Sequence, residues 1–162
     1  MKAIVIGATG AVGQDLVKTL LYDDRYETVT TFTRRPLGFT HPKIESFIVD
    51  FNLPDTWHHL VQGDVLFSAL GTSLKQAGSK EAQYRVDHDY QLSFARAARE
   101  NGVPHMVLVS SVGADSSSRF FYLQLKGLIE KDVEALQFPS LTILRPPSLI
   151  RKHAKRPAET VS

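Results

Sequence analysis

The chain of 162 residues contains no cysteine, only two methionines and a single tryptophan. The absence of cysteine excludes disulfide bonds, thiolate nucleophiles and cysteine-ligated zinc or iron–sulfur centres, and it fits a reducing compartment. No charge-free apolar run approaches the roughly 20 residues that a membrane-spanning helix needs. Because three glycines interrupt the apolar N-terminal stretch, we expect a buried strand there rather than a signal segment, and therefore a cytoplasmic protein.

Composition and charge are those of an ordinary globular protein. Hydrophobic residues make up 43% of the chain and charged residues 22%, and the formal net charge is +2. A balance so close to neutral does not indicate a nucleic-acid partner. The six histidines are scattered without carboxylates at metal-site spacing, so we expect no metal site. The length predicts one domain over residues 1–150, followed by a solvated basic tail over 151–162.

Apolar runs of strand length alternate with longer stretches of helical periodicity. This alternation predicts an α/β fold, a doubly wound parallel sheet with six strands. The predicted strands cover residues 3–7, 28–33, 44–49, 64–70, 105–109 and 141–144. Helices are expected over 11–21, 81–100 and 117–137, where apolar residues recur at helical spacing.

A glycine-rich turn lies between the first predicted strand and the first predicted helix. Gly7 allows a sharp turn, Gly10 lets a phosphate approach the backbone, and Gly13 lets the helix pack closely on the sheet. The helix N-terminus then offers free amides and a partial positive charge to a diphosphate. The alternative is a tight turn without a ligand. The predicted phosphate-binding residues are Gly7, Thr9, Gly10, Ala11, Val12 and Gly13.

A serine pair, a tyrosine and a lysine form the second candidate constellation. Tyr122 and Lys126 stand four apart on one face of a predicted helix, so the lysine ammonium favours the phenolate form. Ser110 and Ser111 end the preceding strand, where a hydroxyl can hold a substrate carbonyl oxygen. Strand alternation lets only one of them face the site, and both stay open. The alternative is that Tyr122 simply packs against the helix stripe.

These motifs together resemble the short-chain dehydrogenase/reductase superfamily, in particular its atypical NmrA-like branch that includes the Tat-interacting-protein type. The resemblance covers residues 1 to about 150 and implies a dinucleotide-binding Rossmann fold. It implies that Tyr122 donates a proton, that Lys126 lowers the tyrosine pKa and holds the ribose, and that a serine orients the substrate. A small-residue loop is expected against the ribose at Ala69, Leu70 and Gly71.

The end of the second strand indicates which dinucleotide is bound. Arg34 and Arg35 stand there with no acid in reach, which favours NADP(H) over NAD(H), because a guanidinium matches a 2′-phosphate. A solvated basic pair is the alternative. The resemblance places an acid near the adenine, which is Asp50 in this chain; a helix cap or a surface acid is the other interpretation.

Two functions are compatible with this pattern. The first is an NADP(H)-dependent reductase of a small carbonyl or quinone substrate. The second is a non-catalytic, NmrA-like redox sensor that reports the bound nucleotide to a regulatory protein partner. Asp87 stands where many members of the resembling family have Asn. We also expect the C-terminal part of the usual fold to be absent, which leaves the nicotinamide end open to water. That absence favours the sensor, whereas the Ser/Tyr/Lys set favours the reductase.

Overall fold

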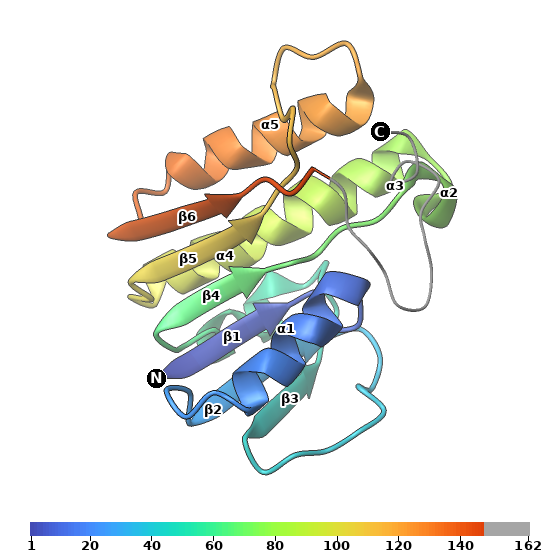
Figure 1. Ribbon diagram of the computed structural model, residues 1–162. Helices are drawn as coiled ribbons and strands as arrows, with labels where there is room; N and C mark the ends of the chain where they lie inside the picture. Colours follow the sequence, from blue (N-terminus) through green and yellow to red (C-terminus); the bar gives the residue numbers. More distant parts are fainter. Residues whose placement is uncertain (148–162) are drawn as a thin grey trace.

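Six parallel strands form a single sheet in the computed structural model, which describes residues 1–147 (Figure 1). Their order across the sheet is β3-β2-β1-β4-β5-β6. The strands are β1 (Lys2–Ile6), β2 (Thr28–Thr33), β3 (Ile44–Ile48), β4 (Val65–Ser68), β5 (His105–Val109) and β6 (Ser140–Leu144). The doubly wound α/β expectation is therefore confirmed, whereas the last residues of the predicted domain and the basic tail lie outside the described residues.

Helices cover both faces of the sheet (Figure 1). They are α1 (Ala11–Leu21), α2 (Leu74–Ala77), α3 (Lys80–Tyr84), α4 (Gln91–Glu100) and α5 (Phe121–Glu134), with short turns η1 (Pro54–Thr56) and η2 (His58–Leu60) and a π-helical turn η3 (Arg85–Tyr90). The α1 helix packs on one face, and α4 and α5 pack on the other. This division follows from right-handed crossovers that run in opposite directions from β1.

The larger core lies under α4 and α5 and is rich in aromatic side chains. Phe32 from β2, Trp57 from the segment before η2 and Phe94 from α4 are all fully buried. The Trp57 and Phe94 rings stack with centroids 4.0 Å apart. Burial of one such side chain contributes roughly 1.5–3 kcal/mol, so this cluster anchors the β3–β4 crossover although that crossover has no long helix.

The helix predicted over 81–100 is instead divided into α3, η3 and α4. The side-chain amide of Gln91 donates to the carbonyl oxygen of Asp87 at 2.5 Å, within the π-helical turn. The amide oxygen of Gln91 accepts from Ser68 Oγ at 2.6 Å, at the carboxyl end of β4. Both bonds are buried, so this side chain ties the wider turn to the sheet. The regular spacing of apolar residues over 81–100 could not predict this π-helical turn.

The predicted helix 117–137 was too long at both ends, because α5 begins at Phe121 and ends at Glu134. Asp115 accepts from the backbone amide of Ser117 at 2.8 Å, and Ser118 Oγ accepts from the amide of Phe120 at 3.1 Å. These side chains offer the backbone a turn in place of a helix. At the other end, Gln137 has a left-handed backbone with φ 57°.

Strand order reverses between β1 and β4, and the glycine turn leaves β1 at that point. Gly7 has φ 85°, and a Cβ there would lie 2.4 Å from the backbone of Ala69. A Cβ at Gly13 would lie 1.8 Å from the carbonyl oxygen of Gly7. Only glycine at both positions lets β1, α1 and the segment after β4 meet this closely. A crevice at the carboxyl edge follows from this topology.

The Gly13→Ala substitution is expected to destabilise the protein by roughly 1–3 kcal/mol, because the added methyl group overlaps the backbone of Gly7. Gly10→Ala is the matched control, since a Cβ there meets only Gly7 oxygen at 3.5 Å. The control should cost under about 1 kcal/mol. Urea unfolding of both variants measures the difference, and equal stabilities would contradict the close-contact interpretation.

Candidate functional site at the carboxyl edge

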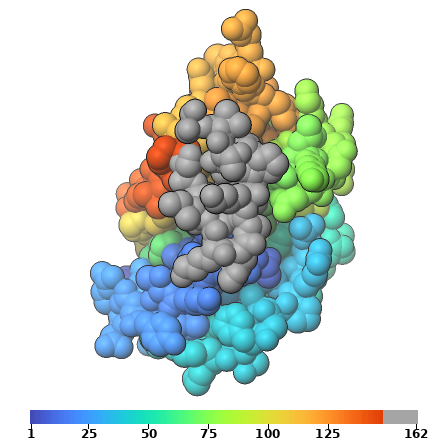
Figure 2. Space-filling model, turned by 45° about the vertical axis from the view of Figure 1, so that its right-hand side comes forward, coloured from blue at the N-terminus to red at the C-terminus, as the bar shows by residue number. Residues whose placement is uncertain are grey.

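A cavity of about 320 Å³ lies at the carboxyl edge of the sheet, beside β1 and β2. Figure 2 turns this part of the molecule toward the viewer, with the blue surface of α1 next to the cyan segment that follows β2. The cavity joins the glycine turn to the predicted arginine pair. Its lining residues are Gly7, Ala8, Thr9, Phe32, Thr33, Arg34, Arg35, Pro36, Phe51 and Leu70.

The N-terminus of α1 has no cap from a side chain. Gly10 donates to the carbonyl oxygen of Gly7 at 3.1 Å, and Gln14 donates to that of Gly10 at 2.8 Å. Within residues 1–147, the amides of Ala11, Val12 and Gly13 have no backbone acceptor. Three adjacent free amides at the positive end of a helix suit an anionic ligand, and a phosphate fits this turn as it stands.

Arg34 and Arg35 are exposed at the rim of the cavity. The guanidinium of Arg34 lies over the Phe51 ring, 5.8 Å from its centroid. The backbone of Arg35 is held by Thr33, whose hydroxyl donates to its carbonyl oxygen at 2.6 Å. Neither arginine pairs with a carboxylate in the described part of the chain. Two cations therefore stand next to the turn with their charge available.

Asp50 takes part in a local turn and is not among the residues that line this cavity. Its carboxylate accepts from the amide of Asn52 at 2.9 Å, and its carbonyl oxygen accepts from Trp57 Nε1 at 2.9 Å. Its neighbour Phe51 is the residue that reaches the cavity. The proposed contact of Asp50 with adenine stays a prediction.

The segment after β4 connects the two predicted parts of the site. The amide of Ala69 donates to the carbonyl oxygen of Ile6 at 3.0 Å, and Leu70 lines the cavity beside β1 and β2. A Cβ on Gly71 would lie 3.7 Å from Lys126 Nζ and equally far from Asp87 Oδ1. This loop therefore lies between the glycine turn and Lys126, and its contact with a ribose stays a prediction.

Tyr122 and Lys126 lie on the first two turns of α5. Lys126 is 5% exposed, and its ammonium lies 5.5 Å from the centroid of the Tyr122 ring. The tyrosine is 38% exposed. The α3 and α5 helices meet beside this pair, where Lys80 Nζ lies 5.4 Å from the centroid of the Phe121 ring. Figure 2 shows the surfaces of α5 and its leading loop (orange) and of α2–α3 (green).

The two serines after β5 have different surroundings. Ser110 is buried, and its hydroxyl donates to Glu130 Oε2 at 2.7 Å. Glu130 is also buried and accepts from Arg145, which follows β6, at 3.0 Å from Nε. Glu130 raises the pKa of Arg145, mainly through this hydrogen bonding. Ser110 therefore joins the end of β5 to α5, whereas Ser111 is half-buried and its hydroxyl donates to the carbonyl oxygen of Val112 at 3.2 Å.

Three acidic groups near the site were not predicted from the sequence as functional residues. Asp87 is fully buried in η3 and accepts from the amide of Thr72 at 2.7 Å, next to Lys126. Asp132 of α5 lies 2.5 Å from His88 Nε2, and Asp89 lies 2.8 Å from His88 Nδ1. Because His88 and Asp132 are 44 residues apart, no local sequence pattern could predict their contact.

The ring of Tyr84 lies beside the cluster formed by His88, Asp89 and Asp132. Tyr84 stacks on His88 with ring centroids 4.6 Å apart. Burial raises the pKa of Tyr84, and the charges of Asp89 and Asp132 raise it further. The ring contact joins α3 to η3, and the His88–Asp132 pair joins η3 to α5, the helix that carries Lys126.

Residues 7–161 match the family described as NAD(P)H-binding. The chain belongs to this family. It is 38% identical over 162 residues to the protein FMP52, mitochondrial, of Debaryomyces hansenii, covering 96% of this chain and 70% of that protein. It is 39% identical over 160 residues to the protein HTATIP2 of Rattus norvegicus, covering 96% of this chain and 66% of that protein. The resemblance stated from the sequence is thereby confirmed.

Solved structures of this fold are more distant in sequence. A short-chain dehydrogenase/reductase superfamily protein from Agrobacterium tumefaciens with bound NAD superposes with a TM-score of 0.75 at 19% identity, covering 90% of this chain and 48% of its own. The Bordetella bronchiseptica enzyme WbmH in complex with NAD+ superposes with a TM-score of 0.76 at 15% identity, covering 94% and 58%. These two show the Rossmann fold, and the chain spans about half of their length.

The expected cytoplasmic location is contradicted by these comparisons. The relative of Debaryomyces hansenii is named a mitochondrial protein, as is the one of Saccharomyces cerevisiae, which is 39% identical over 155 residues. Composition alone could not predict the mitochondrial location of these relatives, because an absence of cysteine fits every reducing compartment. Among the helices of residues 1–147, none has the length and apolar character to cross a membrane.

The Glu130→Gln substitution is expected to lower the free energy of unfolding by about 1.5–3 kcal/mol, because the buried acceptor of Ser110 and Arg145 loses its charge. Glu134→Gln is the matched control, an exposed glutamate on the next turn of the same helix. Guanidinium unfolding of the two variants measures the difference. A Glu130→Gln variant as stable as the control would contradict the structural role of this cluster.

Proposed function

We propose that this protein binds NADP(H) at the carboxyl edge and reduces a small carbonyl or quinone substrate. The observation that carries the proposal is a cavity lined both by Gly7, Ala8 and Thr9 of the glycine turn and by Arg34 and Arg35, next to the uncapped start of α1. The family shown above supports an NAD(P)-binding role, and the preference for the phosphorylated dinucleotide rests on the arginine pair.

The residues of the cavity hold the two ends of the nucleotide differently. The amides of Ala11, Val12 and Gly13 bind the diphosphate, together with the positive end of the α1 dipole. Arg34 and Arg35 bind the 2′-phosphate, because a planar guanidinium forms two parallel hydrogen bonds with phosphate oxygens. Phe51 holds Arg34 at the rim, so less side-chain freedom is lost on binding.

The groups around Lys126 supply the proton that the substrate oxygen accepts. A bound nicotinamide supplies the hydride when it is in its reduced form. Tyr122 donates a proton to the substrate oxygen, and Lys126 stabilises the phenolate that remains, because its ammonium lies at the ring. Ser111 orients the substrate, since Ser110 is engaged with Glu130. The loop at Gly71 leaves room for the ribose beside Lys126.

A second function is favoured by the exposure of Tyr122. A proton donor that is 38% exposed works in water rather than in the dry site that such chemistry favours. The same nucleotide cavity can then serve a regulatory protein that reads its occupancy. Bound NADPH without consumption across a panel of carbonyls and quinones would support this function over the reductase.

Replacement of Arg34 by alanine is expected to weaken NADPH binding about tenfold and to leave NADH binding within about twofold, because only the 2′-phosphate loses a partner. Arg35→Ala should act in the same direction. Lys18→Gln removes a positive charge from the exposed surface of α1 and is the control. Fluorescence titration with both dinucleotides measures the ratio, and an unchanged ratio in both arginine variants would refute the NADP(H) preference.

The Tyr122→Phe substitution is expected to lower kcat roughly 10²–10⁴-fold while the dissociation constant for NADPH stays the same, because it removes only the proton donor. Tyr22→Phe, at an 88% exposed tyrosine on the end of α1, is the control. Ser111→Ala should lower kcat more than Ser110→Ala relative to the fraction of folded protein. Turnover that survives Tyr122→Phe would show that another group donates the proton.

A further inference from the structure

The end of α4 carries the dipeptide Asn101-Gly102, whose asparagine binds the β3–β4 crossover. Asn101 is half-buried, and its Nδ2 donates to the carbonyl oxygen of His58 at 2.8 Å and to that of Val61 at 3.0 Å. A side-chain amide nitrogen carries two hydrogens, so both of its donors are used here. One side chain therefore ties both ends of the turn η2 to α4.

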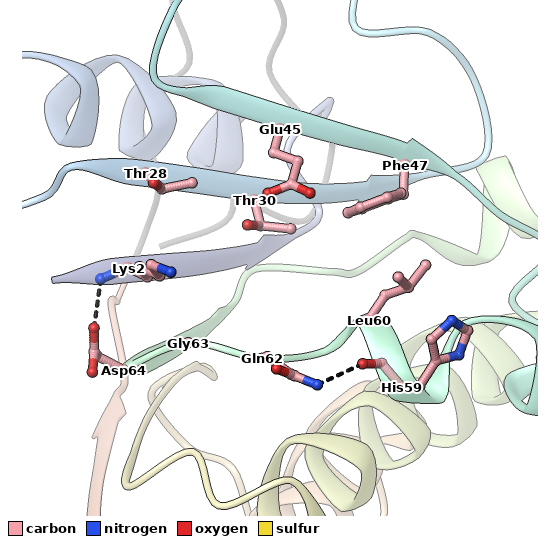
Figure 3. A pocket seen from close by; sticks show the side chains of 10 residues that line it. All are labelled: Lys2, Thr28, Thr30, Glu45, Phe47, His59, Leu60, Gln62, Gly63 and Asp64. Carbon is pink, nitrogen blue, oxygen red and sulfur yellow. Dashed lines mark hydrogen bonds between the residues drawn. The ribbon is translucent and has the colours of Figure 1, made fainter.

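The segment from η2 to β4 contains no long helix. It forms one wall of a cavity of about 550 Å³ at the amino end of the sheet (Figure 3). Within this wall, Gln62 Nε2 donates to the carbonyl oxygen of His59 at 2.9 Å. Val61 is fully buried, and His58 Nε2 lies 2.6 Å from Glu100 Oε2. Two neighbouring side chains at the end of α4 thus hold this segment.

The Asn101-Gly102 pair has the sequence pattern at which asparagine loses its amide most readily, because glycine has no Cβ to hinder attack by its own nitrogen. In this reaction the backbone nitrogen of Gly102 attacks Cγ of Asn101, and a bond forms between these two atoms. The bond from Cγ to Nδ2 breaks, and ammonia leaves with the hydrogen of the attacking nitrogen. Water then opens the succinimide ring at one of its two carbonyl carbons and leaves aspartate or isoaspartate at this position.

The folded backbone holds this dipeptide in an unreactive arrangement. The ψ angle of Asn101 is 3°, which places the nitrogen of Gly102 beside the backbone nitrogen of Asn101 and away from its Cβ, so the ring cannot close. The amide of Gly102 donates to the carbonyl oxygen of Arg99 at 3.2 Å, and the amide of Val103 donates to that of Ala98 at 2.9 Å. Rotation toward the reactive arrangement breaks these bonds. The reaction therefore requires the end of the helix to open.

From these contacts we propose that Asn101 is a modification site: its side chain deamidates when the end of α4 opens, and the product no longer holds the β3–β4 crossover. An ionised carboxylate accepts hydrogen bonds but donates none. After the reaction its oxygens face the carbonyl oxygens of His58 and Val61, which have lost their donor. Closing the helix end then leaves polar groups unpaired, which costs free energy. A reversible opening thereby becomes a lasting release of η2.

The experiment follows deamidation of the full chain in mildly alkaline buffer, folded and in guanidinium chloride, by peptide mass spectrometry. Asn52 is the internal control, since it precedes the bulky Leu53. In the denatured chain, Asn101 should react at least about tenfold faster than Asn52. Folding should slow the reaction at Asn101 about 10- to 100-fold without stopping it. Equal rates in both states, or no product in the folded chain after about 100 half-lives of the denatured reaction, would overturn the proposal.

A matched pair of variants tests the consequence. Asn101→Asp should raise the equilibrium constant for unfolding at least about tenfold, because the product has no donor for the two carbonyl oxygens. Asn52→Asp is the control, since Asn52 acts through Oδ1, which accepts from the Tyr90 hydroxyl at 3.0 Å, and a carboxylate keeps that acceptor.

Hydrogen exchange gives a second measurement that does not depend on a folded variant. Amides of residues 58–62 should exchange at least about tenfold faster in the deamidated fraction of the aged natural chain than in the unmodified fraction. Equal stabilities of the Asn101→Asp and Asn52→Asp variants, or unchanged exchange in the deamidated fraction, would end the proposal.

Discussion

Close main-chain contact between Gly7 and Gly13 is the constraint on which this structure depends. Neither position has room for a methyl group, and Gly7 also adopts a left-handed backbone against the segment after β4. The contact brings the end of β1, the start of α1 and the Ala69–Gly71 segment to one point. The glycine turn and the arginine pair then border one cavity, and Lys126 lies beside Gly71 at the end of this segment, because the backbone can approach so closely.

The two ends of the same strands acquire opposite properties from one topology. At the carboxyl edge, crossovers that leave β1 in both directions open a crevice with exposed amides and cations. At the amino edge, the β3–β4 crossover holds only short turns, so no long helix covers Lys2, Thr30 and Glu45. The crevice with cations at one end and the cavity lined by both signs of charge at the other are therefore consequences of where helices cover the sheet.

Buried polar contacts place α5, and with it Lys126, relative to the crevice. Ser110 and Arg145 hold Glu130 from the ends of β5 and β6, and His88 holds Asp132 from η3. A buried polar group that loses its partner costs free energy. These contacts therefore favour one position of the helix over a range of similar positions. The matching NAD(P)H-binding family supports the nucleotide role, and the chemistry proposed at Tyr122 follows from this placement.

The sequence alone determined the strands, the glycine turn and the arginine pair, because each depends on neighbours within a few residues. The sequence overestimated the uninterrupted length of the helices at 81–100 and 117–137. The side chains of Gln91 and Asp115 form hydrogen bonds that apolar periodicity does not reveal. Only the tertiary structure separated Ser110 from Ser111 and joined His88 to Asp132, because these choices depend on groups that are 20 and 44 residues distant. Local pattern specifies which element forms; packing between elements decides which side chain faces the site.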